Sequence, residues 1–411
     1  MKKGLRSNWI VTGLTVVVMS CVCAASAEAF EVGPLSVGGA IRANYVYGDY
    51  DATGDAPQRG DNGGNFELDT YRINLDFKQD MWIGKAEYRW YDGYNFLHTG
   101  WIGADLGDNG QVQVGLNRVP FGVGAYGPAN SWFFDQHYYV GLSDDMDYGI
   151  KYSRTAGSWM FDVAYYLSAE ANGQGGSDDS ARYSYDIVDT DNPYGHYEEA
   201  SQVNLRTRVN LQDIPCPTQL GASLQYGLLD ADDSAEDSYA AAGSLHSKTT
   251  LGSWALMLQV TRYDYAADYK SGAMDGMGNP LSDDLITMGA YDFAWPVASE
   301  GTIPAVALSY TWKPGVEWID SMTFYNDYSV ILKDGESGSG TELNDSALNV
   351  TGVAIANGGW YIYVDYAYSD GNYFVGDEGD DYSTIEGVGD FGVNGNDEWN
   401  GRFNINFGYY F

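Results

Sequence analysis

The end of the chain alternates strictly between apolar and other side chains. Counting back from the last residue, every second position is apolar: Phe411, Tyr409, Phe407, Ile405 and Phe403. The positions between them are mostly polar residues or glycine. A period of two residues is the repeat of a β-strand, in which successive side chains point to opposite faces. The segment therefore predicts a strand with one apolar face and one polar face.

The same alternation recurs along the whole chain in segments of about ten residues, which is the spacing typical of membrane β-barrels. Sixteen segments are predicted as strands: 35–48, 69–79, 81–91, 97–106, 110–117, 147–155, 157–168, 199–211, 218–229, 238–248, 251–263, 303–313, 318–328, 346–356, 358–368 and 398–411. Their connections alternate between short turns and long loops. Residues 285–293 could form another strand, but an odd number would break this alternation, so we place them inside a long loop.

Charged residues on the polar faces favour a water-filled interior. In 202–211, Arg206 and Arg208 share the polar face, and Leu205 and Val209 lie on the other. A lysine or arginine facing lipid at the bilayer midplane would cost roughly 2–4 kcal/mol, so the charged face must line an aqueous lumen. The predicted fold class is all-β: a transmembrane antiparallel barrel of about 16 strands. A barrel of this size is too wide for side chains to fill its interior.

The amino terminus carries the features of a secretory signal peptide. Three basic residues precede a short apolar run over 9–19, and small-x-small cleavage sites end at Ala27 and Ala29. We therefore expect residues 1–29 to be removed and residues 30–411 to form the barrel. Beyond residue 29 no apolar run reaches the length of a membrane-spanning helix. A closed barrel is then the form in which the exported chain could span a bilayer.

Composition excludes several classes of function. The sequence holds 57 acidic and 21 basic residues, and its net charge of −36 argues against nucleic acid as a partner. No Gly-x-Ser-x-Gly motif is present, and none of the four histidines lies in a recognisable nucleophile motif, so an enzyme is not expected. We predict no catalytic residue, no cofactor and no defined metal site, although the acidic loops could bind divalent cations loosely.

Basic residues gather on the predicted polar faces of the strands, and acidic residues gather in the long loops. The basic strip that we expect to line the pore consists of Arg42, Arg72, Lys85, Arg89, Lys151, Arg206 and Arg208. The loop 118–146 contains Trp132, Phe133 and Phe134 in a row, which indicates that it packs against another surface. We predict that it folds into the lumen as a constriction loop, whose charged residues are Arg118, Asp135, Asp144 and Asp145. A lid at the mouth of the barrel and an oligomer contact are the alternatives for this loop.

Two features resemble known families. The terminal Phe411 at the end of an aromatic-rich strand resembles the terminal signature of bacterial outer-membrane barrels. Residues 114–122, Val-Gly-Leu-Asn-Arg-Val-Pro-Phe-Gly, are similar to the Gly-x-x-x-x-Pro-Phe-Gly stretch of the phosphate-selective porin O/P-like family. That resemblance implies a 16-stranded trimeric barrel. The family's anion-selective members carry an arginine ladder and a lysine cluster at the constriction, whereas this loop has Arg118 and no lysine.

We therefore predict an outer-membrane porin for passive diffusion of small hydrophilic solutes and ions. An anion- or phosphate-selective porin is one alternative, and a structural or adhesive barrel without an open pore is another. The expected partners are outer-membrane lipid, lipopolysaccharide and the diffusing solutes, and a homotrimer is expected by resemblance.

Overall fold

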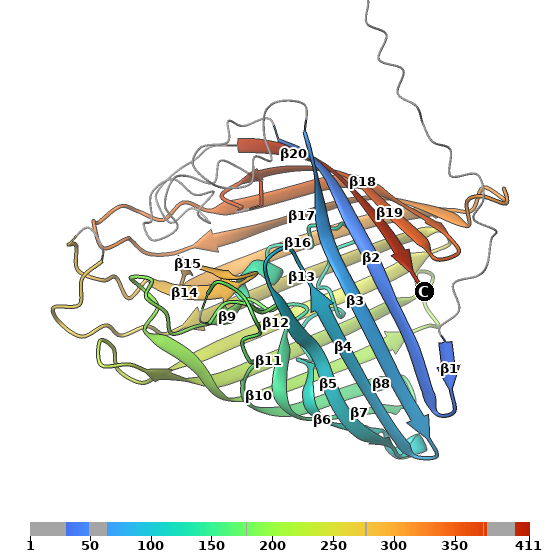
Figure 1. Ribbon diagram of the computed structural model, residues 1–411, viewed down its shortest axis with the longest axis horizontal. Helices are drawn as coiled ribbons and strands as arrows, with labels where there is room; N and C mark the ends of the chain where they lie inside the picture. The colour runs from blue at the N-terminus through green and yellow to red at the C-terminus, as the bar shows by residue number, and fades with distance from the viewer. Residues whose placement is uncertain (1–29, 49–63, 178, 276–277, 373, 376–398) are drawn as a thin grey trace, which may run out of the picture.

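The computed structural model describes residues 30–48, 64–177, 179–275, 278–372, 374–375 and 399–411 (Figure 1). The expected signal peptide, residues 1–29, lies outside the described residues. The strands of the barrel wall are β2 (Leu35–Gly48), β3 (Asn65–Gln79), β4 (Trp82–Trp90), β5 (Asn95–Asp105), β6 (Gln111–Arg118), β7 (Met146–Ala156), β8 (Trp159–Ala169), β10 (Tyr197–Leu211), β11 (Thr218–Ala231), β12 (Ser238–Leu251), β13 (Trp254–Tyr265), β16 (Glu300–Trp312), β17 (Ser321–Lys333), β18 (Ser346–Asn357), β19 (Trp360–Asp370) and β20 (Trp399–Tyr410).

These strands close into a barrel because the first and last of them pair. β2 pairs antiparallel with β20 through nine residue pairs from Ala40–Tyr410 to Gly48–Arg402, and it pairs with β3 on its other side. β8 pairs with β10, and β13 pairs with β16. The short strands in the loops between them are therefore not part of the wall. The wall therefore has 16 strands, and the predicted fold class is confirmed. Closure leaves no strand edge whose backbone groups would face lipid unpaired.

The outer surface of the wall is apolar. Large side chains at the middle of the strands, such as Leu224, Leu245 and Leu258, are exposed, whereas the alternate positions are mostly buried. Exposed tryptophans lie beside the short turns at one end of the barrel: Trp82, Trp159, Trp254, Trp312 and Trp360. Exposed Tyr, Phe and Trp side chains occupy the opposite end: Tyr47, Phe66, Tyr165, Tyr226, Tyr239, Tyr368 and Trp399. Two aromatic belts around an apolar band match the two interfaces of a bilayer.

The remaining elements are short. β1 (Phe30–Val32) pairs with the beginning of β2, and the 3₁₀ helices are η1 (Gly107–Asn109) and η2 (Tyr138–Val140). Within the part of the chain that the structure describes, no helix is both long and apolar enough to cross a bilayer.

As predicted, residues 285–293 do not add a strand to the wall. They nevertheless form regular β-structure within the loop. β14 (Leu285–Ala290) and β15 (Phe293–Ala298) form a hairpin, and β14 also pairs with β9 (Asp186–Ile187). All six residues of β14 are buried, so the hairpin packs inside the protein toward the end that carries the long loops (Figure 1). Its apolar run fits this burial, which sequence alternation alone could not separate from a wall strand.

The apolar band gives a direct prediction for stability. Leu245 lies near the middle of β12 and is 65% exposed on the outer face. We expect Leu245→Arg to lower the free energy of unfolding in lipid vesicles by about 2–4 kcal/mol, because the charge would have to enter hydrocarbon. Urea unfolding in vesicles measures this effect, with Leu245→Met as the apolar control. An equal stability of the two variants would show that this face does not contact lipid.

Candidate functional site: a cavity along the barrel interior

The segment 119–145 connects β6 to β7 and is hydrogen-bonded to strands far from both. The backbone N–H of Gly122 donates to Ser223 of β11 at 3.1 Å, and that of Val123 donates to Gln259 of β13 at 2.9 Å. The N–H of Gln136 donates to Ser329 of β17 at 2.9 Å. These acceptors lie on the buried, polar faces of their strands. The segment therefore spans between strands on different sides of the wall.

Two wall carboxylates bind the middle of this segment. Asp327 of β17 accepts the N–H groups of Asn130 and Ser131 at 2.7 and 2.8 Å, and its other oxygen accepts the Asn130 amide at 2.8 Å. Asp365 of β19 accepts the N–H of Trp132 at 3.1 Å. Hydrogen bonds from N–H groups to a carboxylate are stronger than neutral ones, so these two side chains fix the turn that carries the aromatic triplet.

A third carboxylate, Asp69 of β3, holds the other side of the triplet. It accepts the indole N–H of Trp132 at 3.2 Å and lies 2.7 Å from Nη2 of Arg42. The Asn406 amide of β20 also donates to it at 2.5 Å. The loop therefore contacts β3 as well as β17 and β19.

The Pro-Phe-Gly stretch at the start of the segment is held by a close approach to the wall. Gly122 has a φ of +67°, and a Cβ atom there would lie 2.7 Å from Oε1 of Gln259. Only glycine tolerates both the left-handed backbone and this space. Arg206 of β10 donates to the carbonyls of Phe121 and Gly122 at 3.4 and 3.5 Å. The close contact with the wall therefore explains the Pro-Phe-Gly residues without reference to a solute.

A cavity of about 810 Å³ lies between segment 119–145 and the wall strands β2, β3, β4, β19 and β20. Its lining includes Tyr91 and Tyr94 from the turn between β4 and β5, and Gly358 and Gly359 from the turn between β18 and β19. The first turn lies at the barrel end with the long loops and the second at the opposite end. The cavity lining therefore extends along the barrel from one end to the other.

The cavity carries charges of both signs. Its charged lining residues are Arg42, Arg72, Arg89, Glu67, Asp69, Asp92 and Asp144. The three arginines come from adjacent strands β2, β3 and β4, and each has a carboxylate nearby. Arg42 pairs with Asp69, and Glu87 lies 3.3 Å from Arg72 and 2.6 Å from Arg89.

Asp144, the residue before the end of segment 119–145, also lines the cavity. Its carboxylate lies 2.6 Å from Nη2 of Arg118 and accepts the hydroxyl of Tyr183 at 2.8 Å. Burial raises the pKa of Asp144, while Arg118 and Arg89 oppose that shift. Its ion pair with Arg118 favours the charged form.

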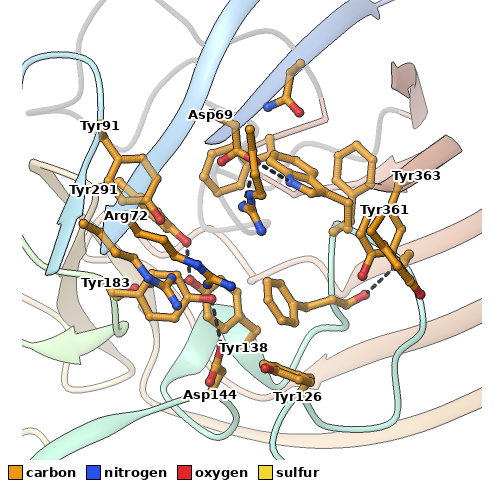
Figure 2. A pocket seen from close by; sticks show the side chains of 18 of the residues that line it. Asp69, Arg72, Tyr91, Tyr126, Tyr138, Asp144, Tyr183, Tyr291, Tyr361 and Tyr363 are labelled. Atoms are coloured by element: carbon orange, nitrogen blue, oxygen red, sulfur yellow. Dashed lines mark hydrogen bonds and ion pairs between the residues drawn. The ribbon is translucent and has the colours of Figure 1, made fainter. Parts of the chain in front are cut away.

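Aromatic side chains cover much of the remaining lining. Figure 2 shows Tyr91, Tyr183 and Tyr291 on one side of the cavity and Tyr361 and Tyr363 on the opposite side. The hydroxyls of Tyr138 and Tyr291 are hydrogen-bonded to each other. The Arg89 guanidinium lies 4.3 Å from the centre of the Tyr183 ring, within the range of a cation–π contact. The cavity therefore combines aromatic faces with fixed charges.

The structure brings some of the predicted site residues together and separates others. Arg42, Arg72, Arg89 and Asp144 line the same cavity. The predicted residues that are not among its lining residues are Lys85, Arg118, Asp135, Asp145, Lys151, Arg206 and Arg208.

Several of those residues support the loop or the wall instead. Lys151 donates to the Arg118 carbonyl at 2.5 Å. Arg208 pairs with Asp162 at 3.1 Å, as Arg206 does at 2.9 Å. Asp135 is 2.5 Å from Nδ1 of His137 and is buried. The polar-face pattern thus identified residues that face inward. It did not distinguish those that line the cavity from those that support segment 119–145 or the wall.

Sequence reasoning missed the carboxylates that hold the loop and most of the tyrosines of the lining. Asp69, Asp327 and Asp365 could have been noticed, because each is an acidic residue on the polar face of a predicted strand or at its start. The sequence gives no comparable indication that Tyr183 and Tyr291 line the cavity, since both lie in long loops. Only the folding of three loops toward one another brings them to the cavity.

The overall structure is similar to solved bacterial barrels. A complex of OmpF from Salmonella typhi with daunomycin has a TM-score of 0.59 and 12% identity, covering 92% of this chain and 97% of that one. An anion-selective porin from Comamonas acidovorans has a TM-score of 0.55 and 12% identity, with coverages of 92% and 99%. OmpT of Vibrio cholerae in its trimer form has a TM-score of 0.52 and 16% identity, with coverages of 93% and 100%.

The chain has the fold of bacterial porins. No protein-family model and no curated protein sequence matches it. The 16-stranded barrel with its apolar band and aromatic belts is an outer-membrane structure, and the expected localisation is confirmed. At sequence identities of 10–16%, the similarity shows a shared fold and does not identify a solute.

The loop anchors give a second prediction. Asp327→Ala removes the acceptor of three hydrogen bonds and leaves the buried N–H of Ser131 without its partner. We expect the free energy of unfolding to fall by at least about 2 kcal/mol, because bonds to a charged acceptor are worth roughly 1.5–3 kcal/mol each. Urea unfolding in vesicles measures the loss. The control is Asp233→Ala at an exposed loop position, and an equally small effect of both variants would contradict the assigned anchor.

Proposed function

We propose that this protein is an outer-membrane porin that passes small hydrophilic solutes and ions by passive diffusion, without enzymatic activity. The observation that carries the proposal is the cavity whose lining includes residues from turns at both ends of the barrel. Segment 119–145 forms the constriction, because its anchors on β11, β13, β17, β19 and β3 hold it beside that cavity.

The charges of the cavity support a general porin with weak ion preference. Four carboxylates and three guanidinium groups line it, and most of them lie near a group of opposite charge. Ion pairs reduce the net field that an ion meets in a narrow pore. The general acidity of the chain adds a preference for cations at the mouth.

An anion-selective or phosphate-selective porin is the second candidate. It is favoured by Arg42, Arg72 and Arg89, which come from three adjacent strands and line one side of the cavity. Arginine binds phosphate and carboxylate groups through two parallel hydrogen bonds. Against this candidate, all three guanidinium groups already form ion pairs, Arg42 with Asp69 and the other two with Glu87.

The proposal includes the assembly and the surroundings of the barrel. We infer that residues 1–29 direct export and are removed, and that lipid and lipopolysaccharide surround the apolar band. The homotrimer is proposed from the resemblance of residues 114–122 and from the trimer form of the Vibrio cholerae OmpT structure.

The purified protein in a planar lipid bilayer under a KCl gradient tests the function. We expect stepwise conductance and a reversal potential that corresponds to a cation-to-anion permeability ratio within about tenfold of one. The triple variant Arg42→Gln, Arg72→Gln, Arg89→Gln should shift this ratio several-fold toward cations, because the carboxylates of the lining remain. A strong anion preference of the wild type would favour the second candidate.

Arg154→Gln is the control, since this arginine is exposed beside the short turn that ends β7. We expect its permeability ratio to equal that of the wild type. An unchanged ratio in the triple variant would show that the three arginines do not line the conducting path. Absence of any conductance steps would overturn the porin function and leave a structural or adhesive barrel.

A further inference from the structure

A cluster of buried carboxylates lies where segment 119–145 ends, on a different set of residues from the cavity. One carboxylate oxygen each from Asp145, Asp147 and Asp186 lies within 4.8 Å of the others. The three side chains are 6%, 1% and 1% exposed. They come from the end of segment 119–145, the start of β7 and the strand β9 in the following loop. Three acidic groups from three parts of the chain therefore converge in the interior.

These carboxylates lack enough donors to satisfy them. Oδ1 of each of the three aspartates is buried and has no hydrogen-bond partner among the described residues. Glu170, which is 2% exposed, likewise has a buried Oε2 without a partner. Its Oε1 accepts the N–H groups of Tyr183 and Ser184, which fixes the orientation of the carboxylate. Four buried oxygens in one region thus have no hydrogen-bond donor in the part of the chain that the structure describes.

The charges around the cluster do not balance. Arg182 lies 2.9 Å from Oδ2 of Asp186 and is the cation paired with the cluster in the described structure. Glu199, which accepts the N–H of Ile187 beside Asp186, is a fifth carboxylate acting on the cluster. With all five ionised, the one guanidinium group would leave about four negative charges uncompensated. Burying unpaired charges is strongly unfavourable, so a group of this kind normally binds a cation or protons.

We propose that Asp145, Asp147 and Asp186, with Glu170 beside them, bind one divalent cation of the calcium type. Calcium takes carboxylate oxygens at about 2.3–2.6 Å, so two ligands on opposite sides of it lie about 4.6–5.2 Å apart. Magnesium binds at about 2.1 Å and keeps several waters, which suits a buried all-carboxylate site less well. The three oxygens lie within 4.8 Å of one another, a spacing that a calcium ion can bridge.

The site would join two loops that line the cavity. Asp145 follows Asp144 at the end of segment 119–145, whereas Asp186 and Glu170 belong to the connection between β8 and β10 that also carries Tyr183. A cation shared by these carboxylates links both segments and offsets their repulsion. The inference concerns binding and stability, so it does not depend on conduction through the barrel.

Isothermal titration of Ca²⁺ into the folded, EGTA-treated full chain tests the site, together with the unfolding temperature in EGTA and in excess CaCl₂. We expect one saturable Ca²⁺ per chain, a higher unfolding temperature with Ca²⁺, and weaker binding of Mg²⁺. The double variant Asp145→Asn, Asp147→Asn should lose the saturable site and the thermal effect of Ca²⁺. In EGTA it should unfold no lower than the wild type, because the substitution removes repulsion.

Asp189→Asn, Asp191→Asn is the matched control, since it removes two loop carboxylates outside the buried cluster. It should keep the single saturable site, which separates specific binding from attraction to the acidic surface. If the double variant fails to fold, Asp147→Asn alone serves, with an expected loss of at least tenfold in affinity. Absence of a saturable site in the wild type, or an unchanged site in the cluster variants, would overturn the proposal.

Discussion

The structure depends on one constraint, the need of every backbone N–H and C=O in hydrocarbon for a partner. Sixteen strands satisfy it by closing through the pairing of β2 with β20. Closure in turn creates an interior that is too wide for the side chains of the wall to fill. Alternation then separates the surfaces, with leucines and aromatic residues outside and polar residues inside. The inward direction of the polar side chains of the wall follows from this geometry.

The loops partly fill the space that closure creates. Segment 119–145 is held by carboxylates of the wall rather than by apolar packing alone, as Asp327 and Asp365 accept backbone N–H groups from it. The hairpin of β14 and β15 and the connection around Tyr183 pack beside it. What remains is a cavity lined by arginines and acidic residues, with tyrosines on two opposite sides (Figure 2). Buried charge is therefore both the anchor of the loop and the feature of the cavity that can act on ions.

The fold could be predicted because strand periodicity is a local property. Each of the 16 wall strands is overlapped by a predicted segment, and the segment 35–48 has the bounds of β2. The site was predicted less completely, because alternation shows that Arg206 faces inward but not that the loop covers it. Tyr183 and Tyr291 reach the cavity only through long loops, whose paths depend on contacts between distant residues. The cluster of Asp145, Asp147 and Asp186 also depends on such contacts, since Asp186 is 39 positions after Asp147.

The most direct test of the account is to narrow the cavity beside segment 119–145 by attaching a reagent to a cysteine introduced in its lining. Tyr126 lines the cavity and is 52% exposed, and Cys216 is an exposed free cysteine that would be replaced by serine first. In the Cys216→Ser, Tyr126→Cys variant, a charged methanethiosulfonate reagent should lower the single-channel current in discrete steps, while Cys216→Ser alone should not respond. An unchanged current, with mass spectrometry showing that the reagent has attached, would place the conducting path elsewhere and contradict the assigned constriction.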